Sequence, residues 1–314
     1  MFKELLDNAL DRYNKGYGTT TIDVVIHPES HFFSVKNDGQ SIGGMSEQYK
    51  DVPVVVQAFS YANTSSSYDQ TAREKSGSVA KNGIGAKVTN LFSEKFEVET
   101  MHKGKKNHVV WKFENEDTFV DLRNRYVVKG VDVDTSTTNS KDSTKVSATV
   151  RTDYFTKEHC WGKREPMEKA CDQIPLGTYY MMRRNVYYAK MLFPKLRITL
   201  NGNDLAPIVP KQLMAPLLTD SAMVNYSKPQ LHLLIGILKE DYGSKVRQSF
   251  MNGAYTHDGG KHVSDVEYRI VQLVKKNHKL DHTYKQNDFR SFLNQLFLYV
   301  CVYESERITW GGYL

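Results

Sequence analysis

Short runs with apolar residues at about every second position recur along this chain, and such runs bury one side only when they pair into a sheet. Between them lie stretches with a helical period of about 3.6 residues. We expect helices over residues 2–13, 177–192 and about 265–276, the last with Ser264 and Glu267 as a capping box. We expect a hairpin around Pro28 and a polar connection over 135–144. Strands are expected over residues 21–26, 31–36, 96–100, 107–113, 145–151, 196–200, 231–239, 246–256 and 293–303.

The length and charge of the chain limit its class. With 314 residues it is long enough for two domains, for which we expect residues 1–207 and 208–314. Lys and Arg exceed Asp and Glu by 42 − 36 = 6, which suits phosphate-rich partners such as nucleotides or DNA and equally suits simple solubility. No run of about 18 apolar residues and no signal-peptide pattern occurs, so we expect a protein of the cytoplasm, nucleoid or nucleus, not a secreted one. Reduced thiols, without a zinc site or disulfide framework, are expected at Cys160, Cys171 and Cys301.

The first candidate for chemistry is a polar face on the opening helix. Its members are Glu4, Asp7, Asn8 and Asp11, whose three- and four-residue spacing points them to one side. A carboxylate there could polarise a water for attack on a phosphate, and the amide of Asn8 could bind a hard cation such as Mg²⁺. Taken alone, the same pattern also fits a solvated helix face.

The second candidate is the segment 35–43, at the end of a predicted strand. Asn37 and Asp38 have short hydrogen-bonding side chains, and Gly39 lets the backbone turn and approach a flat ligand closely. By itself this segment fits an ordinary turn as well as a base-binding site.

The third candidate is the glycine-rich segment 77–87. Glycines just before a helix leave backbone N–H groups free to surround an anion, and Lys81 and Lys87 add positive charge. The segment lacks the GxxxxGK[ST] spacing of a P-loop, so a Walker-type fold is not indicated. Residues 61–87 as a whole are too polar for a core, and we expect a functional loop or lid there. Taken alone, the glycines fit a flexible turn equally well.

In this order, the three candidates resemble the nucleotide-binding boxes of the GHKL ATPase superfamily, which includes gyrase, the large heat-shock chaperone, histidine kinases and MutL. Segments 64–69, 92–100 and 250–263 extend the resemblance to the ATPase and transducer region of type IIA DNA topoisomerases, closest to eukaryotic, large-virus and T-even-phage enzymes. The resemblance implies an α+β fold: a GHKL (Bergerat) α/β sandwich with a mixed sheet, followed by a transducer domain of the ribosomal-S5-like type.

The resemblance also implies a role for each matching position. Glu4 would be the general base that activates the attacking water, and Asn8 would ligate a Mg²⁺ ion that bridges the phosphates. Asn37 would read the amino edge of adenine. ATP and Mg²⁺ are therefore the implied cofactors. The other implied nucleotide contacts come from Ser65, Ser66, Ser67, Asn82, Gly83, Ile84, Gly85, Ala86 and Lys87.

The sequence departs from the family pattern in three places. Ser41 stands where the second glycine of the D-x-G-x-G box is expected, so the loop under the adenine should be less pliable or shifted. The family's Gln-Thr-Lys loop, whose lysine reaches the γ-phosphate, should follow the last strand, but residues 308–314 contain no lysine. This implies either a sequence cut just before the loop or poor hydrolysis of ATP. The N-terminal strap that embraces the partner subunit in the family is not seen ahead of Glu4.

The implied function is the N-gate portion of a type II DNA topoisomerase, in which ATP closes a homodimer over duplex DNA and hydrolysis resets the gate. DNA cleavage would then need TOPRIM and breakage regions, on a separate subunit or in a missing C-terminal portion. Two alternatives remain open. One is a stand-alone ATP-switched clamp resembling the heat-shock chaperone or MutL, and the other is a non-catalytic nucleotide-binding homologue of a topoisomerase subunit.

Overall fold

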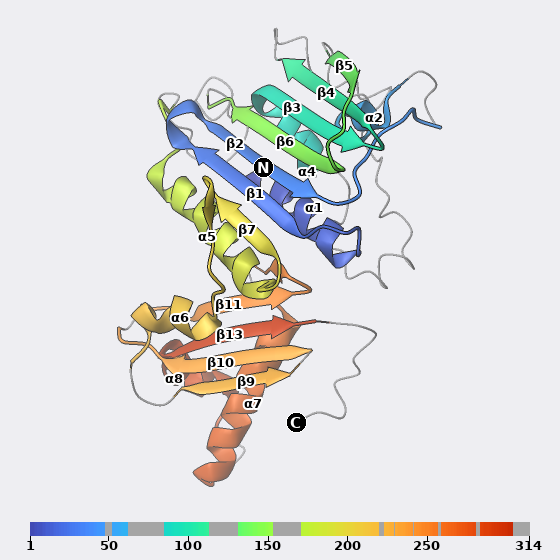
Figure 1. Ribbon diagram of the computed structural model, residues 1–314. Helices are drawn as coiled ribbons and strands as arrows, with labels where there is room; N and C mark the ends of the chain where they lie inside the picture. Colours follow the sequence, from blue (N-terminus) through green and yellow to red (C-terminus); the bar gives the residue numbers. More distant parts are fainter. Residues whose placement is uncertain are drawn as a thin grey trace. The chain divides into compact units, whose positions relative to one another are not determined.

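The strand-like runs form two sheets, one in each of two units that comprise Met1–Pro207 and Ile208–Leu314 (Figure 1). Among the described helices, none is long and apolar enough to cross a membrane. Among the described residues, Cys171 and Cys301 are not in disulfide bonds, and Cys160 lies outside those residues. The structure is a computed structural model that describes residues 1–47, 52–61, 85–112, 131–152, 171–219, 223–228, 230–240, 242–256, 259–280 and 283–303.

The sheet of the first unit has eight strands in the order β5-β4-β3-β6-β2-β1-β7-β8. Most neighbours run antiparallel, but β1 and β7 are parallel, so the sheet is mixed, as expected. Its strands are β1 (Thr21–His27), β2 (Phe32–Asp38), β3 (Ser93–His102), β4 (Lys105–Lys112), β5 (Val131–Thr137), β6 (Ser143–Val150), β7 (Arg197–Leu200) and β8 (Asn203–Asp204).

The predicted hairpin around Pro28 is confirmed. β1 and β2 pair antiparallel with Val24 opposite Val35, and the short 3-10 helix η1 (Pro28–Ser30) joins them. Alternate residues of β1 are buried, which gives the strand one face for the helices. The strands predicted at 96–100, 107–113, 145–151 and 196–200 are present as β3, β4, β6 and β7.

A layer of helices covers one face of this sheet. Helix α1 contacts β2, α4 and α5, and α4 in turn contacts α2, β3 and β6; in Figure 1, α1 and α4 lie behind β1, β2 and β6. The apolar side of α1 enters the core, where the ring of Phe2 meets that of Phe33 edge-on at a centroid distance of 5.5 Å. The helices predicted at 2–13 and 177–192 are confirmed. The layer consists of α1 (Phe2–Asn14), α2 (Val54–Ser60), α4 (Gly85–Leu91) and α5 (Leu176–Leu192).

One predicted connection is partly a strand. The polar stretch 135–144 predicts a connection, but β5 extends to Thr137 and pairs with β4, placing Ser136 opposite Lys106. Strand β5 is the edge of the sheet, and all its residues after Val131 are exposed. Residues 135–137 contain no apolar side chain, so the sequence pattern does not mark this end of the strand.

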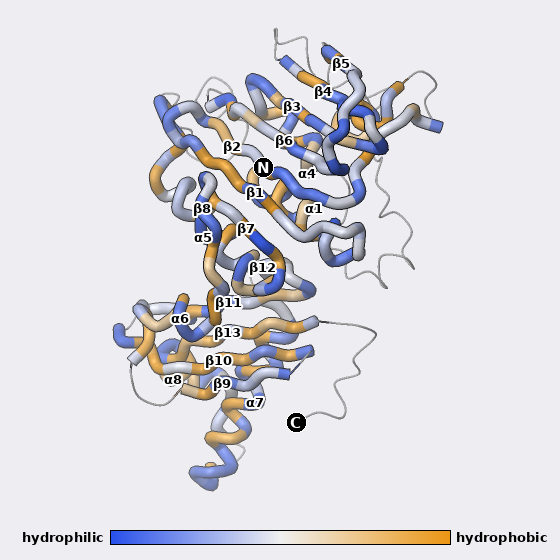
Figure 2. The backbone as a smooth tube through the Cα atoms, in the orientation of Figure 1, coloured by the Kyte–Doolittle hydropathy of each residue, from blue (hydrophilic) through white to orange (hydrophobic). Residues whose placement is uncertain are grey.

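The sheet of the second unit has five strands in the order β12-β11-β13-β10-β9. Strand β13 lies in the middle, and every one of its residues is buried; Figure 2 shows hydrophobic residues along it and along β10. Helix α7 packs on one face, with Val263 and Val266 against alternate residues of β13. The elements are α6 (Pro210–Met214), η4 (Ala215–Leu217), β9 (Val224–Lys228), β10 (Leu231–Ile237), β11 (Val246–Met251), β12 (Ala254–Tyr255), α7 (Lys261–Asn277), η5 (Gln286–Phe289), α8 (Arg290–Asn294) and β13 (Leu296–Val302).

The predicted start of the long helix in this unit is wrong. Helix α7 begins at Lys261, and Gly260 is its N-cap residue. Ser264 therefore lies inside the first turn, where its hydroxyl donates to the carbonyl of Gly260 at 3.3 Å. Glu267 forms ion pairs with strand β11, so these two residues do not make a capping box.

Three predicted strands of this unit are shorter than expected. Residues 246–256 form β11 and β12, because a tight turn at Asn252 and Gly253, with φ of 52° and 85°, reverses the chain. The last strand starts at Leu296, since α8 occupies the residues just before it. The strand predicted at 231–239 is confirmed as β10, two residues shorter at its end.

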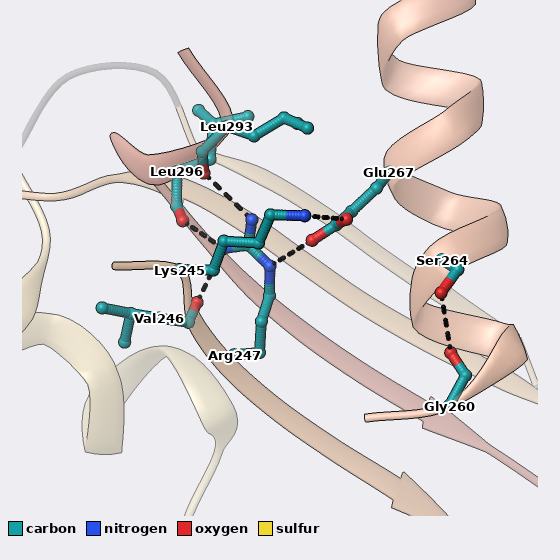
Figure 3. Close-up of polar contacts among 8 residues, drawn as sticks. All are labelled: Lys245, Val246, Arg247, Gly260, Ser264, Glu267, Leu293 and Leu296. Carbon is teal, nitrogen blue, oxygen red and sulfur yellow. Dashed lines mark hydrogen bonds and ion pairs between the residues drawn. The ribbon is translucent and has the colours of Figure 1, made fainter. Parts of the chain in front are cut away.

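A partly buried ion-pair cluster attaches α7 to the sheet (Figure 3). Glu267 accepts hydrogen bonds from Nε of Arg247 at 2.7 Å and from Nζ of Lys245 at 2.6 Å. Burial alone would raise the pKa of Glu267, but the hydrogen bonds from these two cations outweigh it and hold the pKa below its ordinary value. The two terminal nitrogens of the Arg247 guanidinium, Nη1 and Nη2, donate to the backbone carbonyls of Val246, Leu293 and Leu296 at 2.6 to 2.9 Å.

We expect Arg247→Met to destabilise the second unit more than Lys245→Met. The Arg247 side chain is 11% exposed, and its loss removes the donor to Oε1 of the buried Glu267 carboxylate and to three backbone carbonyls, at a cost of about 3 kcal/mol. The Lys245 side chain is 40% exposed, so its ion pair is screened by solvent and should contribute less than about 1 kcal/mol. Urea unfolding of the full chain, followed by circular dichroism, measures both free energies. Equal losses would contradict the role given to Arg247.

Candidate functional site

The start of α1 and the start of α4 touch, and this contact is the centre of the candidate site. Gly85 opens α4, and a Cβ built on it would overlap Oε2 of Glu4 and lie 2.6 Å from its Cγ. A larger residue at position 85 therefore requires Glu4 to move. Glu4 is an exposed residue of α1, so its carboxylate is accessible beside the glycine. The structure thus brings together the first and third of the predicted motifs.

Two polar residues of α4 hold the helix in this place. Thr89 is fully buried, and its hydroxyl donates to the carbonyl of Gly85 at 3.0 Å, with the carbonyl of Met1 at 3.4 Å. The amide of Asn90 donates to the carbonyl of Phe59, on α2, at 3.1 Å. Sequence reasoning missed both residues, because no spacing distinguishes them from other polar residues of a short helix.

Asn8 lies one helical turn after Glu4 and on the same face of α1. Its side chain is half-buried, and within the part of the chain that the structure describes its amide has no hydrogen-bond partner. No group of three or more His, Cys, Asp or Glu side chains that could hold a metal occurs in the described ranges. A Mg²⁺ ion at a phosphate site keeps water and phosphate oxygens as ligands, so a single amide oxygen from the protein fits its chemistry.

The other two members of the predicted polar face do not join the site. Asp7 is 8% exposed and Asp11 is 4% exposed, because α4, β2 and α5 cover most of the circumference of α1. Asp7 forms an ion pair with Lys3, and burial raises the pKa of the Asp7 carboxyl to about 6. The expectation that all four polar residues point together is therefore wrong for these two, and the alternative of a solvated face is wrong for them as well.

Asn37 lies at the end of β2, on the face that carries Phe33 and Val35 and that the helices cover. It is 5% exposed, and its Nδ2 donates to the carbonyl of Asp38 at 2.9 Å. Among the described residues no hydrogen-bond donor is bound to the amide oxygen of Asn37, so this oxygen can accept a hydrogen bond from a ligand. Asn37 is thus a buried amide whose oxygen can accept a hydrogen bond from the polar edge of a ligand.

Asp38 instead serves the backbone. Its Oδ1 accepts the N–H groups of Thr20 and Thr21 at 2.7 and 2.8 Å, which ties the end of β2 to the start of β1. Gly39 follows with φ of 89°, and a Cβ there would lie 2.6 Å from the carbonyl oxygen of Tyr17. The glycine is therefore required by a close approach of two backbone segments.

Lys87 is on the first turn of α4, two residues after the glycine. It is 4% exposed, and burial lowers the pKa of its ammonium group to about 8. Ala86, beside it, packs against the core. The predicted loop or lid lies mostly outside the described residues, which resume at Gly85. Also outside them are Ser65, Ser66, Ser67, Asn82, Gly83 and Ile84.

Together these residues offer a defined set of chemical groups on the helix-covered side of one sheet. An accessible carboxylate lies against a glycine, an amide with no partner in the described chain lies one turn away, and a second amide presents an acceptor at the end of β2. A buried cation with a lowered pKa lies on the neighbouring helix. Such a set can hold a flat base by its polar edge and place a water for attack on a phosphate.

No protein-family model matches the chain. The sequence is 26% identical over 330 aligned residues to DNA topoisomerase 2 of Saccharomyces cerevisiae, which covers 98% of this chain and 21% of the relative. It is 25% identical over 284 residues to human DNA topoisomerase 2-beta, which covers 89% of this chain and 16% of the relative. The chain thus spans about a fifth of the length of these curated relatives.

Solved structures match the fold over both units. The ATPase region of Saccharomyces cerevisiae topoisomerase II gives a TM-score of 0.74 at 24% identity, covering 96% of this chain and 72% of that one. The ATPase and transducer domains of DNA topoisomerase II from Balamuthia mandrillaris give a TM-score of 0.71 at 23% identity, covering 96% and 71%. These matches confirm the expected fold class, a GHKL ATPase fold followed by a transducer fold.

The buried carboxyl on α1 leads to a pH-dependent prediction. Because the pKa of Asp7 is raised from 3.8 to about 6, the folded state holds this proton more tightly, and the associated stability is lost as the pH rises through about 6. Asp7→Asn mimics the protonated form, so we expect it to raise the free energy of unfolding by about 2 kcal/mol at neutral pH. Below about pH 4 it should change little. Urea titrations at both pH values test this, with Asp132→Asn, at an exposed position of β5, as the control.

Proposed function

We propose that this chain, an ATPase region of the type IIA DNA topoisomerase family, binds and hydrolyses ATP at the site formed by α1, α4 and the end of β2. The observation that carries the proposal is the contact between the Glu4 carboxylate and Gly85. The contact supports the proposal because a carboxylate can activate a water and Gly85 belongs to the glycine-rich segment that can surround a phosphate.

Hydrolysis at this site needs one base and fixed positions. Glu4 takes a proton from a water molecule as the water oxygen forms a bond to the γ-phosphorus. The bond from this phosphorus to the bridging oxygen breaks, which releases ADP and inorganic phosphate. Gly85 keeps the carboxylate within reach, since any side chain at this position would displace it.

The remaining groups bind and orient the nucleotide. The amide oxygen of Asn37 accepts a hydrogen bond from the amino group of adenine. Lys87, on the first turn of α4, compensates the negative charge of the phosphates. Asn8 supplies an amide oxygen for Mg²⁺, which when bound neutralises charge on the phosphate oxygens. The serines at 65–67 and residues 82–84 and 86 complete the proposed set of contacts, by resemblance.

On the scale of the chain, the unit 1–207 is the GHKL ATP-binding domain and the unit 208–314 is the transducer. ATP binding closes a homodimer over duplex DNA, and hydrolysis reopens it. Since the chain spans about a fifth of the relatives' length, strand cleavage belongs to TOPRIM and breakage regions outside this sequence. The protein then acts in the cytoplasm, nucleoid or nucleus, where its DNA is.

The base role of Glu4 predicts separate effects on turnover and binding. Glu4→Gln should lower ATP turnover by about 10²-fold or more, because the amide cannot take the proton from water. The dissociation constant for ATP, measured by isothermal titration calorimetry, should stay within about threefold, since the variant keeps the size of the side chain. Glu29→Gln, on η1 at the other end of β1, should change neither quantity. Turnover unaffected by Glu4→Gln would refute the base assignment, and absence of ATP binding to the unaltered chain would refute the proposed function.

The lowered pKa of Lys87 predicts that ATP affinity depends on pH. The charged ammonium binds phosphate, and the free protein loses this proton as the pH rises through about 8. We therefore expect ATP affinity to fall about tenfold between about pH 8 and pH 9.5, with binding accompanied by proton uptake. Lys87→Met should bind ATP more weakly at neutral pH and lose this dependence. Lys105→Met, at an exposed position of β4, should retain it. A dependence that persists in Lys87→Met would assign the titration to another group.

A further inference from the structure

A cluster of polar side chains adjoins the loop that follows Asn37 and takes no part in the chemistry above. At its centre is Ser41, which is 4% exposed. Its hydroxyl donates to the carbonyl of Met101, near the end of β3, and lies 3.3 Å from Nδ1 of His102. Because the Ser41 side chain is buried and hydrogen-bonded, it fixes the loop to the sheet by a specific contact.

His102 extends this attachment along the loop. Its ring lies against Gly43, where a Cβ would be 2.7 Å from Cδ2 of the ring. Asp142, in the connection between β5 and β6, has Oδ2 at 3.7 Å from Nδ1 of His102, and its Oδ1 accepts the N–H of Lys103 at 2.9 Å. The turn between β3 and β4 and the connection before β6 therefore support the loop from one side.

The connection between α1 and β1 supports the loop from the other side. The N–H of Gln40 donates to the carbonyl of Tyr17 at 2.8 Å, and the guanidinium of Arg12 donates to the carbonyl of Gln40. The hydroxyl of Thr19 donates to the carbonyl of Asp38 at 2.9 Å. The backbone from 38 to 41 is thus held between two parts of the unit, with Ser41 as the attachment to β3.

This backbone also sets the direction of the Asn37 amide. Nδ2 of Asn37 donates to the carbonyl of Asp38, so the amide plane follows the position of that carbonyl. In this orientation the amide oxygen points away from the Asp38 carbonyl, and it can accept a hydrogen bond from the amino group of adenine. Guanine carries a carbonyl oxygen at the corresponding position, so two hydrogen-bond acceptors, this oxygen and the amide oxygen of Asn37, would face each other. If the loop moved, the amide could rotate and the preference would weaken.

We propose that Ser41 is a positioning residue for base selection. Its hydroxyl, held by Met101 and flanked by His102, fixes the loop whose Asp38 carbonyl orients the Asn37 amide toward an amino group. This inference rests on the proposed function, because it requires a purine nucleotide at Asn37. It gives the serine, which departs from the glycine of the resembled motif, a part in choosing the nucleotide.

The test compares ATP and GTP binding to the full chain. Isothermal titration calorimetry with Mg²⁺ gives a dissociation constant for each nucleotide, and we expect the unaltered chain to prefer ATP. Ser41→Ala removes one buried hydrogen bond, so the preference for ATP should weaken. The ratio of the dissociation constant for GTP to that for ATP should fall about tenfold. The turnover number at saturating ATP should remain within about threefold, because Ser41 acts before the chemical step. If Ser41 had a purely structural role, the substitution would weaken the binding of ATP and of GTP equally and leave the ratio unchanged.

The controls separate this inference from the function on which it rests. Ser249→Ala removes a buried serine of the second unit, whose hydroxyl donates to the carbonyl of Thr256 at 3.1 Å, and should leave the ratio unchanged. His102→Ala should lower the ratio as Ser41→Ala does, and the double variant should add little, since both act through one attachment. If Ser41→Ala does not fold, the His102→Ala variant provides the test of the positioning role.

If the unaltered chain binds no ATP, the proposed function fails. If it selects ATP and both single variants keep the ratio, the positioning role of Ser41 is overturned while the function stands.

Discussion

A carboxylate packed against a glycine Cα determines how the candidate site is built. Glu4 can occupy its place only because Gly85 carries no Cβ, and the buried hydroxyl of Thr89 keeps the start of α4 beside the start of α1. The acidic half and the glycine half of the site come from different helices. Helix packing on the sheet, not any local turn, therefore creates the position at which a phosphate and a water could meet.

The polar residues around this contact divide into two groups with different energetics. Glu4 and Asn8 lie where solvent or a ligand reaches them, whereas Asp7 and Lys87 are buried. Burial raises the pKa of Asp7 and lowers the pKa of Lys87, and both shifts favour the neutral form. Burial raises the free energy of the charged form of each group. A polyanion bound near α4 would favour the charged form of Lys87, so the buried lysine links ligand charge to protonation. The second unit uses burial differently, since Glu267 remains ionised between two cations and attaches α7 to the sheet.

Much of the fold could be predicted from periodicity. The hairpin around Pro28, the helix at 2–13 and the strands at 96–100 and 107–113 each have one buried face, and that is the feature a sequence pattern records. The end of β5 was predicted as a connection because residues 135–137 are all polar and exposed. The start of α7 was misplaced because Ser264 and Glu267 match a capping box by spacing, while tertiary partners use both side chains otherwise.

The sequence by itself determined which residue types are available to the site and their order along the chain, because side-chain chemistry and helical spacing are local properties. It could not decide which polar residues of α1 are buried, since that depends on how α4, β2 and α5 surround the helix. Nor could it assign Asp38 and Gly39 to backbone contacts with residues 17–21. Those outcomes arise from contacts between segments distant in the chain, and only the tertiary structure brings such segments together.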